Sequence, residues 1–390
     1  MRNPLSDKIV DIKPSGIRKF FDIVSEMDDA ISLGVGEPDF DTPWHIRDEG
    51  IYSLEKGRTF YTSNAGLKEL KIEICNYLER RFHLTYNYAN EVLVTVGGSE
   101  AIDIALRTMV NPGDEVLIPQ PSYVSYEPCA VLADAVPVII NLKAENEFRL
   151  TAQELRDAIT DKTKVLVLPF PNNPTGAIME KKDLEEIAEV ILEKDLFVIS
   201  DEIYSELTYK ADHVSIASIP GMQERTILIN GFSKSYAMTG WRLGYAAAPV
   251  DFIKAMVRVH QYINTCAASF VQEAGITALE KAEPDVQEMV KEYARRRDYM
   301  VSAINSMDGV SCKTPGGAFY VFMNIKSFGM SSADMANYLL EEAKIATVPG
   351  SAFGSQGEGY VRFSYACSYE RIVEGMERMR KALAKLPKKA

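Results

Sequence analysis

Short apolar runs rich in β-branched residues alternate with amphipathic helical segments along most of the chain. Seven runs are predicted to be strands: Glu91–Val96, Glu115–Ile118, Val136–Ile140, Lys164–Pro169, Leu196–Ser200, Thr226–Asn230 and Leu243–Ala247. Most of them are apolar throughout, which is typical of strands buried on both faces. Helical patterns lie between them, for example at Glu100–Val110 and Lys181–Lys194. The alternation predicts an α/β fold with a mostly parallel, seven-stranded sheet sandwiched by helices.

The pattern changes after about residue 282. A charged amphipathic helix is predicted over Lys291–Met307, followed by a hairpin-like stretch over Val310–Met323 and further helices. The chain has 390 residues, and single cores stop growing at about 250–300 residues. We therefore expect an N-terminal arm with part of a small domain at 1–47, a large ligand-binding domain at 48–282, and a small α+β domain at 283–390.

Composition excludes several classes of partner. Lys and Arg number 43 against 55 Asp and Glu, so the net charge is −12, which disfavours binding to nucleic acid or to an anionic membrane. The five cysteines are scattered and the four histidines have no ligand spacing, so neither a disulfide framework nor a metal site is expected. The N-terminus is too polar for a signal peptide, and no apolar run could span a membrane. We expect a cytoplasmic protein.

Two motifs rich in turn residues follow predicted strands. Gly97-Gly98-Ser99 opens a helix, where glycines admit close approach of a ligand and free N–H groups favour an anion. The pattern favours a phosphate site, although a plain strand-to-helix turn explains it too. Pro171 to Gly176, with sequence Pro-Asn-Asn-Pro-Thr-Gly, forms a rigid turn that could present Asn173 to a ligand.

Charged residues stand at the ends of other predicted strands. Asp201 follows a buried strand, where its carboxylate needs a cation or a donor, or else caps the next helix; Tyr204 could share its face. Lys234 stands among small and aromatic residues near Arg242, and burial beside a cation yields the neutral amine that a Schiff base requires. Arg362 interrupts an apolar strand and could bind a carboxylate or form a structural ion pair.

These motifs together carry a family resemblance over nearly the whole chain. The stretches Asn-Asn-Pro-Thr-Gly from Asn172 and Ser-Lys-Ser-Tyr-Ala-Met-Thr-Gly-Trp-Arg from Ser233 resemble the class I and II aminotransferases of the fold-type I pyridoxal-phosphate superfamily. Ser-Asp-Glu-Ile-Tyr-Ser-Glu-Leu-Thr-Tyr from Ser200 is similar to the branch of prokaryotic aspartate, aromatic and N-acetyl-diaminopimelate aminotransferases. The large domain would then bind pyridoxal 5′-phosphate.

The resemblance implies a role for each motif residue. Lys234 would form the aldimine with the coenzyme and carry protons during ping-pong transfer, and Asp201 would pair with the pyridinium nitrogen. Tyr204 and Asn173 would bind the ring hydroxyl, and Tyr123 would stack on the ring. The phosphate would be held by four residues: Gly98, Ser99, Ser233 and Arg242.

The substrates and the assembly are also implied. Arg362 would bind the substrate carboxylate with help from Asn173 and the backbone at Gly36. Tyr61 would reach the phosphate of a neighbouring subunit, which implies a homodimer. The reaction would move an amino group from an L-amino acid, such as aspartate, an aromatic amino acid or N-acetyl-diaminopimelate, to a 2-oxo acid, with 2-oxoglutarate expected as acceptor.

Two positions depart from the family pattern. Gly231 stands where many relatives have a serine, so one phosphate hydrogen bond would be lost. The segment 261–266 lacks the arginine with which some aspartate enzymes bind a side-chain carboxylate, so dicarboxylic specificity does not follow.

Three other functions compete with transamination on the sequence alone. A pyridoxal-phosphate C–S β-lyase would use the same lysine, aspartate and arginine. A non-catalytic regulator that senses the coenzyme is disfavoured because the roughly 30 residues before the fold are too few for a helix-turn-helix domain. A nicotinamide dehydrogenase is disfavoured because the third glycine of the dinucleotide motif is missing.

Overall fold

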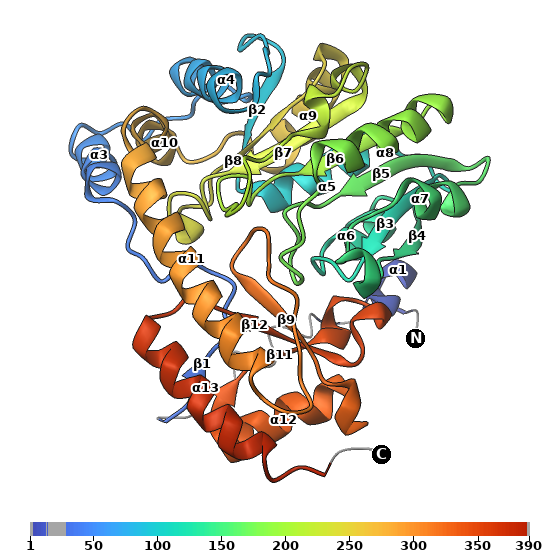
Figure 1. The fold of residues 1–390 in the computed structure, drawn as a ribbon. Coiled ribbons are helices and arrows are strands. Elements are labelled where there is room, and N and C mark those ends of the chain that lie inside the picture. Colours follow the sequence, from blue (N-terminus) through green and yellow to red (C-terminus); the bar gives the residue numbers. More distant parts are fainter. Residues whose placement is uncertain (1–2, 13, 15–28, 388–390) are drawn as a thin grey trace.

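The computed structural model describes residues 3–12, 14 and 29–387. Its main sheet has seven strands in the spatial order β2-β8-β7-β6-β5-β3-β4 (Figure 1). Their bounds are Val92–Thr95 (β2), Glu115–Gln120 (β3), Val136–Asn141 (β4), Thr163–Leu168 (β5), Phe197–Asp201 (β6), Thr226–Gly231 (β7) and Gly244–Ala247 (β8). The seven predicted strands and the mostly parallel sheet are thus confirmed.

One strand of this sheet runs against the others. β8 pairs antiparallel with both β2 and β7, whereas the remaining pairs are parallel. Gly244, the first residue of β8, lies opposite Thr95 at the end of β2 and Gly231 at the end of β7. The loop that enters β8 therefore lies at the same edge as the carboxyl ends of the parallel strands, which is the edge where open α/β sheets bind ligands.

Alternate residues of the central strands enter opposite cores. Leu166 and Leu168 of β5 belong to one apolar cluster, and Val165 and Val167 belong to another. A strand with both faces buried has no polar side to show, which explains the apolar runs in the sequence. The covering helices are α3 (Trp44–Glu55), α4 (Lys68–Phe82), α5 (Gly98–Met109), α6 (Tyr126–Leu132), α7 (Ala152–Ala158), α8 (Lys181–Glu193), α9 (Val250–Ile263) and α10 (Ser269–Lys281).

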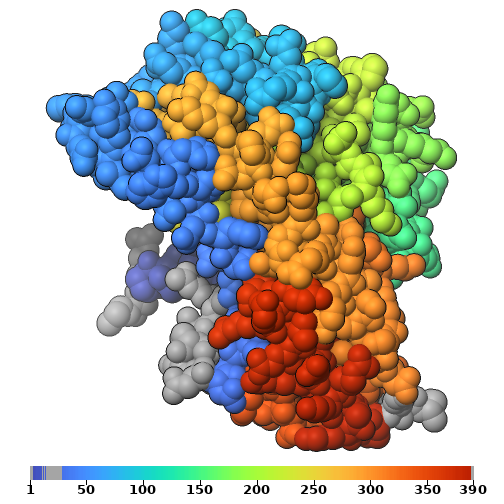
Figure 2. Space-filling model, turned by 60° about the vertical axis from the view of Figure 1, so that its left-hand side comes forward, coloured from blue at the N-terminus to red at the C-terminus, as the bar shows by residue number. Residues whose placement is uncertain are grey.

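The C-terminal part forms a second, smaller layer below the main sheet, orange and red in Figures 1 and 2. It contains α11 (Glu283–Asn305), β9 (Tyr320–Asn324), α12 (Ser332–Ala343), β11 (Val348–Pro349), β12 (Tyr360–Ser364) and α13 (Tyr369–Leu383). The short strand β1 (Ile31–Ser32) pairs with β10 (Ile345–Ala346), so the N-terminal segment joins this layer. The division at residues 47 and 282 stays a prediction that this pairing supports.

The hairpin-like stretch expected over Val310–Met323 is confirmed only in part. β9 pairs with β12, and Ser311 makes only a single bridge to Asn324. The reason is that the amides of Gly316 and Gly317 both donate to the carbonyl of Gly176, each at 2.9 Å. Residues 315–318 therefore form a loop that binds the main layer instead of a returning strand.

None of the helices in the described part of the chain is both long enough and apolar enough to cross a membrane.

The centre of the main sheet should dominate stability. Leu228 of β7 has no exposed surface, so Leu228→Ala should lower the free energy of unfolding by about 2–5 kcal/mol through lost burial and a cavity. Leu192 on α8 is 41% exposed, and Leu192→Ala should change it by less than about 0.5 kcal/mol. Urea unfolding followed by circular dichroism measures both, and equal losses would contradict the assignment of the core.

Candidate active site

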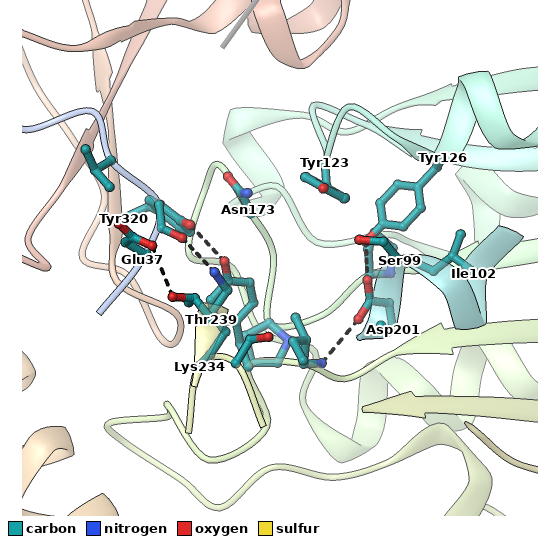
Figure 3. Close-up of a pocket in the computed structure, with 18 of the residues that line it drawn as sticks. Glu37, Ser99, Ile102, Tyr123, Tyr126, Asn173, Asp201, Lys234, Thr239 and Tyr320 are labelled. Atoms are coloured by element: carbon teal, nitrogen blue, oxygen red, sulfur yellow. Dashed lines mark hydrogen bonds between the residues drawn. The ribbon is translucent and has the colours of Figure 1, made fainter. Parts of the chain in front are cut away.

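A cavity of about 520 Å³ opens at the carboxyl edge of the main sheet and is closed from the other side by the C-terminal layer. Figure 3 shows Asp201 and Tyr126 on one side of it and Glu37 and Tyr320 on the other. Eleven of the twelve residues predicted from sequence line it: Gly36, Gly98, Ser99, Tyr123, Asn173, Asp201, Tyr204, Ser233, Lys234, Arg242 and Arg362. The exception is Tyr61, which is 85% exposed and lies outside the cavity.

The glycine motif forms a tight turn into α5. Gly97 has a φ of +75°, a region that favours glycine, and α5 begins at Gly98 with its free N–H groups at the cavity. Gly244 of β8 packs against this turn so closely that an added Cβ would lie 2.6 Å from the carbonyl carbon of Gly97. Arg242 stands beside the same turn, with a hydrogen bond of 2.8 Å to the carbonyl of Thr239. The turn thus combines helix N–H groups with a guanidinium, as an anion site requires.

A buried carboxylate behind this turn fixes its shape. Glu100 accepts hydrogen bonds from the amide of Val96 (2.5 Å), from Nδ1 of His260 (2.6 Å) and from Asn264 (2.7 Å). Burial alone would raise the pKa of Glu100, but these donors outweigh it and lower the pKa. His260 is fully buried against Glu100 and does not line the cavity.

Asp201 ends β6 with its carboxylate inside the protein. Its Oδ2 accepts the hydroxyl of Tyr126 at 2.7 Å, and its Oδ1 accepts the amide of Ile203 at 3.2 Å. Burial raises the pKa of Asp201, and these two donors oppose the rise. The alternative of a helix cap is wrong because residues 203–206 form a turn and not a helix. A cationic hydrogen-bond donor in the cavity would stabilise this carboxylate.

The turn after Asp201 is anchored at nearly every residue. Glu202 is buried and accepts hydrogen bonds from Ser200 and Ser215, and it also pairs with His213 at 2.8 Å. Ser205 accepts from Asn230, and Glu206 binds Tyr77 and Arg81. Asp201 and Tyr204 therefore hold fixed positions, which a binding site needs.

Lys234 follows β7 and points across the cavity. Its ammonium donates to the carbonyl of Gly36 at 2.7 Å. Burial lowers its pKa from 10.5 to about 8; Glu37 opposes this change, while Arg362 and Arg242 add to it. An amine that loses its proton near neutral pH can attack a carbonyl carbon.

Arg362 carries a buried charge that none of the described carboxylates neutralises. It is 1% exposed and donates to Oδ1 of Asn173 (2.8 Å) and to the carbonyl of Gly34 (2.5 Å). Its Nε has no hydrogen-bond partner, and within the described ranges no carboxylate forms an ion pair with it. Burial lowers the pKa of Arg362. A guanidinium in this state is a site for a carboxylate from a ligand.

The turn of the proline motif explains how Asn173 reaches Arg362. Its neighbour Asn172 is fully buried, and Oδ1 of Asn172 accepts the amide (3.2 Å) and the hydroxyl (2.8 Å) of Thr175. Asn172 thus fixes the turn, and Asn173 faces the cavity (Figure 3).

Sequence reasoning missed several residues that line the cavity: Val35, Glu37, Ile102, Tyr126, Thr239 and Tyr320. Tyr126 follows the end of β3 and Tyr123, so its position at the carboxyl edge was a usable signal. Tyr320 had no such signal, because its place depends on the pairing of β9 with β12.

The two departures from the family pattern have structural counterparts. An added Cβ at Gly231 would lie 3.0 Å from the carbonyl oxygen of Leu243 and 3.1 Å from Cα of Gly244, so a larger residue is crowded there. In the segment 261–266, Tyr262 is 85% exposed, and no residue of the segment lines the cavity.

Among the residues that the structure describes, there is no group of three or more His, Cys, Asp or Glu that could hold a metal ion. The cavity offers instead an amine, a carboxylate, an anion turn and a guanidinium, the set expected of an enzyme that binds a phosphorylated aldehyde and a carboxylic acid.

Comparison with known proteins agrees with this class. The family model for aminotransferase class I and II matches residues 28–379, and the chain belongs to this family and is an aminotransferase. Among curated relatives, a putative aminotransferase of Bacillus subtilis, YugH, is 51% identical over 99% of this chain and 100% of its own. An aspartate aminotransferase of Pyrococcus abyssi is 48% identical over 97% and 98% of the two chains.

Other relatives differ in the amino acid that their names give. A probable N-acetyl-LL-diaminopimelate aminotransferase of Bacillus subtilis is 44% identical over 97% of this chain and 95% of its own. The crystal structure of an aromatic aminotransferase from Pyrococcus horikoshii superposes with a TM-score of 0.90 at 46% identity, over 95% and 99% of the chains. The resemblance to this branch, the fold class and the enzyme class expected from sequence are therefore confirmed.

The close approach of β8 to the glycine turn gives a test of the anion site. Gly244→Ala should force Gly97 and Gly98 away from Arg242 and weaken binding of inorganic phosphate about tenfold, with a loss of stability of about 1–3 kcal/mol. Gly240→Ala is the matched control, because nothing lies within 4 Å of its added Cβ. Calorimetric titration with phosphate measures the affinities, and equal affinity in both variants would contradict the role of this turn.

Proposed function

We propose that this aminotransferase holds pyridoxal 5′-phosphate in the cavity and transfers an amino group from an L-amino acid to a 2-oxo acid. The observation that carries the proposal is that one cavity contains both a buried amine, that of Lys234, and a buried carboxylate, that of Asp201. When bound, the coenzyme supplies an aldehyde and a protonated ring that accepts electrons. These two ends need an uncharged amine and an anion, which Lys234 and Asp201 supply.

The residues present fit the coenzyme at each of its polar groups. The carboxylate of Asp201 suits the ring nitrogen, and Tyr204 and Asn173 offer donors to the ring hydroxyl. Tyr123 lines the cavity as an aromatic face against which a ring can stack. The phosphate is assigned to the anion turn: Gly98, Ser99, Ser233 and Arg242.

The chain's own residues also define the reaction. Arg362 binds the substrate carboxylate, because a buried guanidinium without an anion gains most from a bidentate partner. Asn173, bonded to Arg362, and the backbone at Gly36 complete this carboxylate subsite. With the substrate carboxylate fixed there, the amine of Lys234 can take a proton from the substrate α-carbon and return it elsewhere.

The choice of amino donor stays open among aspartate, aromatic amino acids and N-acetyl-diaminopimelate, with 2-oxoglutarate as the proposed acceptor. Among the described residues that line the cavity, the basic side chains are Lys234, Arg242 and Arg362. All three have proposed roles at the coenzyme or at the α-carboxylate, so the described residues that line the cavity offer no further cation for a side-chain carboxylate. Product measurement with each donor against 2-oxoglutarate decides between them.

The pKa of Lys234 gives a test of the coenzyme proposal. The amine is protonated below a pKa of about 8 and neutral above it, so capture of pyridoxal phosphate by the apoprotein should accelerate with pH and level off above about 8. A solvated lysine, with a pKa of about 10.4, would level off two units higher. Stopped-flow absorbance in the visible range measures the rate.

The matched variants are Lys234→Ala and Lys254→Ala, the latter on the exposed face of α9. Borohydride should fix the coenzyme covalently to wild type and to Lys254→Ala but not to Lys234→Ala, and amino donors should bleach the visible band only in the first two. Covalent labelling or turnover in Lys234→Ala would refute the proposal.

We propose further that the enzyme acts as a homodimer in which Tyr61 binds the phosphate of the partner's coenzyme. Phe60 and Tyr61 are 83% and 85% exposed, and Tyr262 and Ile263 at the end of α9 are 85% and 53% exposed. Asn64 bonds Gln261 at 3.4 Å, so these two exposed segments adjoin. An exposed apolar patch of this kind is typical of a subunit interface.

Subunit mixing tests this arrangement. Tyr61→Phe should weaken coenzyme binding about tenfold by removing one hydrogen bond to an anion, and Lys234→Ala should be inactive. Co-refolded mixtures in equal amounts should regain about a quarter of wild-type activity at limiting coenzyme, because half of the dimers then combine one intact Lys234 with one intact Tyr61. No recovery on mixing, with both variants folded, would place Tyr61 in its own subunit's site or in none.

A further inference from the structure

Tyr320 lies where three parts of the cavity meet. It begins β9, and in the antiparallel pair with β12 it lies opposite Ser364, two residues from Arg362 on the same face. Its side chain is 1% exposed and lines the cavity.

The hydroxyl and the ring of Tyr320 contact different functional residues. The hydroxyl lies 2.8 Å from the hydroxyl of Tyr204. The face of the ring lies 4.3 Å from the guanidinium carbon of Arg362, within the range of a cation–π contact. Phe353 lies 4.8 Å from the same guanidinium carbon, so two aromatic rings contact Arg362.

The backbone at Gly36 is shaped to admit this hydroxyl. An added Cβ at Gly36 would lie 2.7 Å from the hydroxyl oxygen of Tyr320, so no larger residue fits without displacing it. The carbonyl of Gly36 in turn accepts the ammonium of Lys234. The hydroxyl of Tyr320 is therefore held between the segment that faces Lys234 and the tyrosine proposed to bind the coenzyme.

Two hydroxyl groups that share one hydrogen bond leave one proton free. Burial raises the pKa of both Tyr204 and Tyr320, so both are protonated at neutral pH. If Tyr320 donates to Tyr204, the proton of Tyr204 is free for an acceptor in the cavity, and a hydroxyl that accepts a bond becomes a stronger donor.

We propose that Tyr320 is a positioning residue with two separable actions: its hydroxyl orients and strengthens Tyr204 as a donor to the ring hydroxyl of the coenzyme, and its ring face holds Arg362 for the substrate carboxylate. The proposal rests on the function proposed above. One side chain thus influences both the electronic state of the coenzyme and the affinity of the carboxylate subsite.

Two variants separate these actions in the coenzyme-loaded protein. Tyr320→Phe keeps the ring and removes the hydroxyl. Tyr204 then donates more weakly to the ring oxygen of the coenzyme. That oxygen carries negative charge when the lysine-linked chromophore loses its proton, so the deprotonated form is less stable. The pKa of the chromophore should therefore rise by about half a unit to one unit. Absorbance as a function of pH measures this pKa without turnover. The dissociation constant of succinate, which has carboxylates but neither amine nor oxo group, should stay within about twofold.

Tyr320→Leu removes the ring as well. The chromophore pKa should rise as in Tyr320→Phe, and the dissociation constant of succinate, followed by the spectral change on binding, should increase about three- to tenfold. The matched control is Tyr365→Phe. Tyr365 forms a similar buried pair with Tyr209 at 3.3 Å but lies outside the cavity, so this variant should match wild type in both measurements.

The outcomes separate the two proposals. A wild-type protein without a borohydride-reducible chromophore would overturn the proposed function itself. With that chromophore present, an unchanged pKa in Tyr320→Phe, or equal succinate affinity in the Phe and Leu variants, would overturn the corresponding action of Tyr320. An equal pKa change in Tyr365→Phe would assign the effect to general packing and also overturn the proposal.

Discussion

The constraint on which the site depends is that two opposite charges are buried in one cavity without neutralising each other. Asp201 is held by a tyrosine hydroxyl and a backbone amide, and Arg362 by an amide oxygen and a backbone carbonyl. Each charge is oriented by neutral groups. Each can therefore still attract an opposite charge on a ligand in the cavity. A ligand with a cationic end and an anionic end is stabilised there.

The main sheet makes this arrangement possible through strand direction. Parallel strands bring the glycine turn, Asp201 and Lys234 to one edge, and the antiparallel β8 brings Arg242 to the same edge from its amino end. Residues about 100 positions apart in sequence are thereby placed in one cavity. The C-terminal layer contributes Arg362 and Tyr320, so neither layer alone contains the complete site.

Most of the main sheet and most of the cavity residues could be predicted from the sequence because the signals for them are local. Apolar runs mark doubly buried strands, and motifs directly after them mark the ligand edge, so the positions of Asp201 and Lys234 followed from their neighbours. Tyr320 could not be found in this way, because its contacts depend on the register between β9 and β12, in which it pairs with Ser364, 44 residues further along the chain. The expected hairpin-like stretch is limited to one bridge for a related reason: the amides of Gly316 and Gly317 are bonded to Gly176 in the other layer.

That last contact has a wider consequence. Gly176 has a φ of +69° and accepts two amides from residues 316 and 317, and an added Cβ there would lie 2.5 Å from Pro315. The two layers are therefore aligned by main-chain atoms, which a change of side chain in the cavity does not alter. Side chains that line the cavity, such as Val35 and Ile102, can therefore change without moving the two layers, and the spacing between Asp201 in one layer and Arg362 in the other is kept.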